Sequence, residues 1–172
     1  MMKPHFSMFA LYNRWANERL YEAVASLPDT DYRANRGAFF GSLHGTLNHL
    51  VVADRIWMRR FTGTGPLQTR LDEILAEELG PLQALRREED ERIIAFVESL
   101  GEDDLVATFT YRTVVNPRDI TQPLSPALAH FFNHQTHHRG QAHGLVTEIA
   151  GNVAMPSLDL IMFQRETGIG LA

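Results

Sequence analysis

Residues 124–149 combine a helical apolar pattern with a histidine cluster, and this combination restricts the fold more than any other stretch. Apolar residues recur there at steps of three and four, which is the period of one face of an α-helix. They are Leu124, Leu128, Phe131, Phe132, Ala142, Leu145, Val146 and Ile149. Five of the eight histidines lie between residues 130 and 143, in the stretch HFFNHQTHHRGQAH. The pattern predicts a long helix with imidazoles beside its buried face.

His134 and His138 border this apolar face. Because the two residues are four positions apart, their side chains lie one turn apart on the same side of the helix. Two imidazoles in this arrangement can bind one metal ion. His130, His137 and His143 fall further from the face, where a histidine more often is a surface residue. A complete metal site therefore needs a third ligand from elsewhere in the chain.

The composition restricts the class of protein. The chain has 172 residues, a hydrophobic fraction of 44%, a net charge of −5 and no cysteine. This predicts one globular domain over residues 1–172, with no thiolate ligand, disulfide or cysteine nucleophile. The absence of cysteine fits a cytoplasmic location. The negative charge argues against nucleic-acid binding, and no apolar run is long enough for a membrane span.

The remaining sequence also has mostly helical periodicity. Long helices are predicted over residues 6–27, 42–61 and 81–100, and a short one over 69–79. Ser42 is the expected N-cap of the second helix, and Ser125-Pro126 is expected to begin the histidine helix. We expect that helix to end at Gly151.

Two smaller elements complete the predicted architecture. Residues 106–115 are rich in β-branched and aromatic side chains, and Asn116-Pro117-Arg118-Asp119 has the composition of a turn. A hairpin with its second arm at residues 119–122 is expected, and a short final helix over 157–166. The predicted fold class is all-α, an up-down four-helix bundle with a small β-hairpin before the last long helix and a short C-terminal helix.

The second predicted helix, residues 42–61, carries two histidines and an acidic residue on its apolar face. His44 and His49 are both candidates for the third ligand, and periodicity alone does not choose between them. Asp54 projects into the main apolar face of this helix. It is either salt-bridged for structural reasons or a group that orients a ligand of the site.

Three stretches carry a resemblance to a known family. They are FALYNRWANERLY, SLHGTLNHLVVADRIWMRRF and HFFNHQTHHRGQAH, of which the last is the most specific. Over nearly its whole length the chain resembles the DinB-like (DinB/YfiT) family of four-helix-bundle metal-binding proteins. The resemblance implies a mononuclear divalent-metal site formed by His49, His134 and His138. It also implies a homodimer, which helices that are apolar on more than one side support.

Other metal sites fit these residues poorly. A metallopeptidase of the H-E-x-x-H type needs a glutamate as general base directly after its first histidine, and Gln135 occupies that position. A ferritin-like di-iron site needs Glu-x-x-His motifs. Phe131, Gln135 and Thr46 stand three residues before the candidate ligands instead.

Three neutral imidazoles would leave a divalent ion with its full charge and an open position. Imidazole suits zinc, nickel, copper and iron alike, so the sequence does not identify the metal; nickel, zinc or iron is expected. The leading hypothesis is a metal-dependent enzyme, a thiol-dependent S-transferase or a hydrolase acting on a small molecule, as in some relatives. The alternative is a non-catalytic, stress-associated metal-binding homodimer. Asp54, Asn133 and Gln141 are expected to orient the ligands, and no catalytic residue is assigned.

Overall fold

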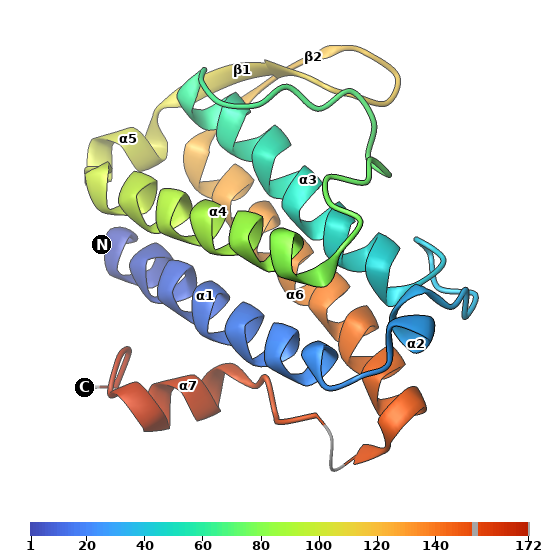
Figure 1. The fold of residues 1–172 in the computed structure, drawn as a ribbon. Helices are drawn as coiled ribbons and strands as arrows, with labels where there is room; N and C mark the ends of the chain where they lie inside the picture. Colours follow the sequence, from blue (N-terminus) through green and yellow to red (C-terminus); the bar gives the residue numbers. More distant parts are fainter. Residues whose placement is uncertain (153–154, 172) are drawn as a thin grey trace.

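Four long helices form the bundle in a computed structural model that describes residues 1–152 and 155–171 (Figure 1). They are α1 (Lys3–Ala25), α3 (Leu43–Thr62), α4 (Leu79–Ser99) and α6 (Leu124–Ala150). Both α1 and α3 pack against α4 and α6. The predicted all-α class and four-helix bundle are confirmed. Among the described helices, none has the length and apolar character needed to cross a membrane.

The long helices run up, down, down and up in chain order, so the alternation of the predicted up-down bundle is interrupted between α3 and α4. Arg86 of α4 contacts Asp54 of α3, and Phe96 further along α4 stacks on Phe61 further along α3. The two helices are therefore parallel, as Figure 1 shows, whereas α1 and α6 run in the opposite direction. Residues 63–78, here called the crossover segment, return the chain to the end of the bundle where α3 begins.

Five shorter elements accompany the bundle in the part of the chain that the structure describes. They are α2 (Asp29–Arg33), α5 (Glu102–Val106), β1 (Thr108–Arg112), β2 (Asp119–Pro123) and α7 (Leu160–Thr167). The strands form an antiparallel hairpin in which Thr108 lies opposite Pro123 and Arg112 opposite Asp119. This confirms the predicted hairpin and the short C-terminal helix.

The helix ends follow local sequence signals in two of three places. The Ser42 side chain accepts the N–H of Gly45 at 3.1 Å, which confirms the predicted N-cap of α3. Gly151 ends α6 as expected. The start predicted at Ser125-Pro126 is wrong, because α6 begins at Leu124 with Pro123 as its N-cap. A proline in the first turn costs no helical hydrogen bond, since N–H groups there have no partner in the helix.

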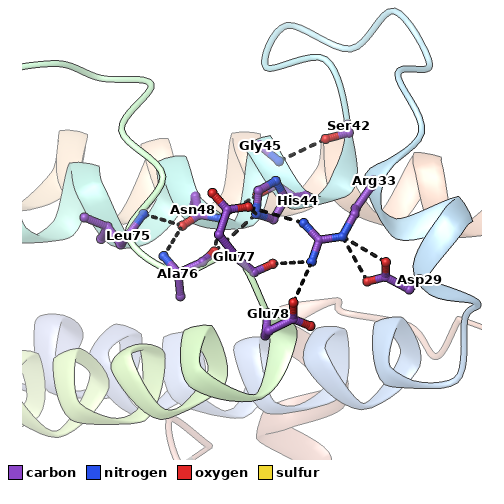
Figure 2. Close-up of polar contacts among 10 residues, drawn as sticks. All are labelled: Asp29, Arg33, Ser42, His44, Gly45, Asn48, Leu75, Ala76, Glu77 and Glu78. Atoms are coloured by element: carbon purple, nitrogen blue, oxygen red, sulfur yellow. Dashed lines mark hydrogen bonds and ion pairs between the residues drawn. The ribbon is translucent and has the colours of Figure 1, made fainter.

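The short helix predicted over residues 69–79 is also wrong. Up to residue 78 the chain is irregular, and α4 begins only at Leu79. The Asn48 side chain of α3 supplies the hydrogen bonds that a helix would otherwise provide. Its Oδ1 accepts the N–H groups of Leu75 at 2.8 Å and Ala76 at 3.1 Å, and its Nδ2 donates to the Ala76 carbonyl at 3.2 Å (Figure 2).

Buried polar side chains lie between two apolar clusters of the bundle. One cluster includes Phe6, Met58, Ile93 and Phe131, and the other includes Leu20, Leu50, Leu82 and Ala142. In each long helix at least one buried polar residue falls between the residues of the two clusters. This polar layer consists of Asn13, Asn17, Asp54, Arg86, Asp90, Gln135 and Arg139.

Arg86 is the central cation of the polar layer. Its Nη1 lies 2.6 Å from Asp54 Oδ2 and its Nη2 lies 3.0 Å from Asp90 Oδ1. Gln135 donates a further hydrogen bond to Asp54. Of the two interpretations of Asp54, the structure bears out the salt bridge. Burial raises the pKa of Asp54 to about 6, although the Arg86 charge opposes that shift.

Candidate metal centre

The bundle brings His49 of α3 and the pair His134 and His138 of α6 together. Ring centroids are 5.3 Å apart for His49 and His134, 4.6 Å for His49 and His138, and 4.4 Å for the pair on α6. One ring nitrogen of each lies within 4.8 Å of the others. These are the three residues that the family resemblance indicates, and the group could hold a metal ion.

His49 is held with one nitrogen facing away from the cluster. Its Nδ1 lies 2.7 Å from the carbonyl oxygen of Leu71, in the crossover segment. A carbonyl only accepts, so Nδ1 carries the proton and Nε2 presents a lone pair. Nε2 is buried and has no hydrogen-bond partner among the described residues. Such a nitrogen is suited to bind a metal ion, since an unpaired buried polar atom is costly.

His138 is oriented by a residue of its own helix. Its Nδ1 lies 2.8 Å from Oε1 of Gln141. The amide nitrogen Nε2 of the same Gln141 lies 3.2 Å from Nε2 of His137. Gln141 is thus one of the expected supporting groups that the structure places beside a ligand. Asn133 is exposed, with no side-chain hydrogen bond in the described part of the chain, and Asp54 belongs to the polar layer.

The Leu71 carbonyl and the aromatic ring of Phe40 are parts of the site that sequence reasoning missed. Phe40 stacks on His49 with ring centroids 3.7 Å apart and ring planes at 18°. Neither leaves a signal in the sequence. A backbone carbonyl has no residue type, and Phe40 lies in an irregular segment before α3.

The site favours neutral imidazoles. Burial lowers the pKa of His49 to about 4, although its bond to Leu71 opposes the shift. Burial and the neighbouring histidines lower the pKa of His134 to about 3, and burial also lowers the pKa of His138. All three rings are therefore unprotonated at neutral pH, which is the state that binds a metal ion.

Two cavities, both lined by Leu71, reach the histidine cluster. One, of about 310 Å³, is lined by Phe39, Phe40 and all three candidate ligands. The other, of about 240 Å³, extends from His49 and His134 towards the hairpin and is here called the hairpin-side cavity. It is lined by His49, Ala53, Ile56, Trp57, Arg60, Leu71, Thr113, Val114, Val115, His130 and His134. A small molecule could therefore reach the histidine cluster through these cavities.

The other histidines occupy different environments. His44, the second candidate on α3, lies 3.2 Å from the Ala76 carbonyl through its Nε2 and so contacts the crossover segment (Figure 2). His130 packs on Trp57 with ring centroids 5.1 Å apart. The structure thus separates His44 from His49, which the spacing on α3 could not do.

The three histidines fit a divalent metal ion. One nitrogen of each ring points into the cluster, and these donors carry no charge. The Nδ1 atoms of His49 and His138 are held by hydrogen bonds outside the cluster. The buried, unpaired lone pair of His49 Nε2 is suited to donate to such an ion. The donor set of three imidazoles does not discriminate among nickel, zinc and iron.

Fold and site together define a four-helix-bundle protein with a cluster of three histidines between two of its long helices. The model of the DinB family matches residues 1–166, and the chain belongs to this family. It is similar to Protein DinB of Bacillus subtilis (strain 168), with 23% identity over 168 residues, covering 91% of this chain and 92% of that protein.

Proposed function

We propose that His49, His134 and His138 bind one divalent ion, nickel, zinc or iron, in a metal-dependent enzyme. The observation that carries this proposal is the convergence of three neutral imidazoles around a buried, unpaired Nε2 of His49. Two cavities beside the cluster favour a site that a small molecule reaches over a closed structural one.

The residues around the site have separate tasks. A bound divalent ion would supply a Lewis acid that lowers the pKa of a water or a small thiol. The Leu71 carbonyl and Gln141 hold the rings of His49 and His138 in one tautomer and orientation. Phe40 covers one face of His49 and limits the access of water there.

The reaction that we propose is a thiol-dependent S-transfer or a hydrolysis on a small molecule. The chain has no cysteine, so the sulfur of a thiol reaction must come from a cosubstrate. The alternative function is that of a non-catalytic, stress-associated metal-binding protein. No residue is assigned as general base.

Alanine substitutions test the ligand set. His49→Ala, His134→Ala and His138→Ala should each abolish stoichiometric metal binding, measured by elemental analysis of the purified protein, because each deletes one donor. His44→Ala on the same helix as His49, and His137→Ala on α6, are the matched controls and should retain the metal. Full metal content in the His49→Ala variant would show that the proposed set is wrong.

Chelation separates the two functions. In an enzyme with an open site, removal of the ion should leave the helical circular dichroism nearly unchanged, because the two apolar clusters do not include the histidines. Loss of helix on chelation would favour the structural alternative.

We further propose a cytoplasmic homodimer. Phe39, Leu67 and Val115 are exposed by 81%, 67% and 61% and line cavities at or near the site. Exposed apolar residues of this kind are commonly covered by a partner. The second apolar side of α3 gives less support than expected, since Val52 and Ile56 are already buried within one chain. A monomeric mass by sedimentation at micromolar concentration would contradict the dimer.

A further inference from the structure

Arg60 is a half-buried cation that no carboxylate of the described residues neutralises. Its guanidinium carbon lies 4.4 Å from the Trp57 ring centroid and 4.6 Å from that of Tyr111. Within the described residues it forms no ion pair, and its one hydrogen bond, to the Arg112 carbonyl, is long at 3.4 Å. Arg55 of the same helix, by comparison, pairs with Glu89 at 3.2 Å.

Arg60 lines the same hairpin-side cavity as two of the candidate metal ligands, His49 and His134. The described residues that line this cavity include no aspartate or glutamate, and most of them are apolar. The cavity therefore has a cluster of neutral imidazoles and an uncompensated positive charge within one space. A molecule that carried a negative charge would neutralise Arg60, and no described side chain lining the cavity does so.

We propose that Arg60 binds the carboxylate of a small substrate or cosubstrate whose other end reaches the histidine cluster. The inference rests on the proposed function, because it assigns a substrate class to that site. Aromatic contacts with Trp57 and Tyr111 hold the guanidinium in place before the ligand arrives.

The chemistry of Arg60 favours a carboxylate over larger anions. A guanidinium presents parallel N–H donors that match the two oxygens of a planar carboxylate. One arginine balances one negative charge, and the cavity of about 240 Å³ holds only a small molecule. The ligand class is therefore a short monocarboxylate, and for thiol chemistry a short mercapto-acid.

Two thiols that differ in charge test this assignment on the cobalt-substituted protein. We expect 3-mercaptopropionate to perturb the cobalt absorption bands at a concentration roughly tenfold or more below that needed for the neutral 3-mercapto-1-propanol. Arg60→Gln should remove most of that preference. Arg59→Gln is the matched control, because Arg59 is the preceding residue and donates instead to the Gly65 carbonyl at 2.6 Å. Equal affinity for the two thiols in the unmodified protein would overturn the proposal.

A second measurement needs neither a thiol nor a metal. Propionate is titrated into the metal-free protein, and the Nε–H signal of Arg60, identified by its loss in Arg60→Gln, is followed by NMR. A saturable shift of this signal supports the carboxylate site whether or not a thiol perturbs the cobalt bands. If no thiol perturbs those bands, only the thiol part of the proposed function is contradicted. No shift at millimolar propionate would show that Arg60 does not bind carboxylates. Circular dichroism of both variants verifies that they fold.

Discussion

Gly45 sets the distance between the start of α3 and the segment before it. A methyl group at this position would collide with the carbonyl oxygen of Phe40, whose ring stacks on His49. The residue lies in the first turn of α3, where an alanine would otherwise be the better helix former. The absence of a side chain at Gly45 therefore positions one wall of the histidine site.

Gly45→Ala should destabilise the protein by about 1–3 kcal/mol, because Phe40 or the helix must move. Gly144→Ala in α6 is the control, since among the described residues no heavy atom beyond its chain neighbours and the adjacent helix backbone lies within 4 Å of the added methyl group. There the substitution should stabilise the fold by about 0.5–1 kcal/mol through helix propensity. Urea denaturation of both variants measures the two effects, and the same sign for both would contradict the steric role of Gly45.

The crossover segment becomes part of the site through hydrogen bonds rather than through secondary structure. Asn48 of α3 holds Leu75 and Ala76 with its side-chain amide, and His44 contacts the same Ala76 carbonyl (Figure 2). The segment anchored in this way also presents the Leu71 carbonyl to His49. Asn48 thus helps to hold the segment whose Leu71 carbonyl sets the tautomer of a candidate ligand.

Asn48→Ala should weaken metal binding by about 10- to 100-fold although Asn48 is not a ligand, because the orienting carbonyl is released. Competition with a coloured chelator measures the affinity, and hydrogen exchange should show lost protection at Ala76. Asn133→Ala, on the exposed side of α6, provides the comparison and should leave the affinity unchanged. An unaltered affinity in Asn48→Ala would mean that the crossover segment does not orient His49.

The polar layer joins the four long helices at the level of Arg86. Asp54 of α3 and Asp90 of α4 are both bound to this arginine, and Asn13 and Asn17 of α1 donate to Asp90 at 3.1 and 2.9 Å. Arg139 of α6 completes the layer by donating to Asn13. Sliding α4 by one turn would separate these groups, so the layer selects one arrangement of the bundle.

Arg86→Met should destabilise the whole molecule by about 3–5 kcal/mol, since two buried carboxylates lose their cation. The pKa of Asp54 is already raised by burial to about 6, and it should rise further in the variant. Because a raised carboxyl pKa means that the folded state binds protons more readily, the variant should be least stable above that pKa and recover as the pH falls towards 5.

The measurement for Arg86→Met is thermal or urea unfolding at pH 5 and pH 8. Arg87→Met changes the adjacent, exposed arginine and should alter stability by no more than about 0.5 kcal/mol. Equal stability of the Arg86 variant and the unmodified protein at pH 8 would show that the ion pairs contribute nothing to the fold.

Local sequence patterns sufficed for the four long helices, the hairpin and the cap at Ser42. Helical periodicity and capping depend on residues within about one turn of each other, so they can be read without a partner. The same holds for His134 and His138, whose spacing alone predicted that they face one direction. The short helix over residues 69–79 was predicted wrongly because Asn48, distant in sequence, binds the backbone of that segment.

The sequence by itself thus determined where the four long helices lie, which of their faces are buried, and that two histidines of one helix can bind one metal ion. Only the tertiary structure decided that α4 runs parallel to α3, that Asp54 pairs with Arg86, and that the Leu71 carbonyl orients His49. The reason is physical. Periodicity reports that a face is covered, whereas direction, pairing and orientation depend on contacts between groups far apart in the chain, which form only when the helices pack.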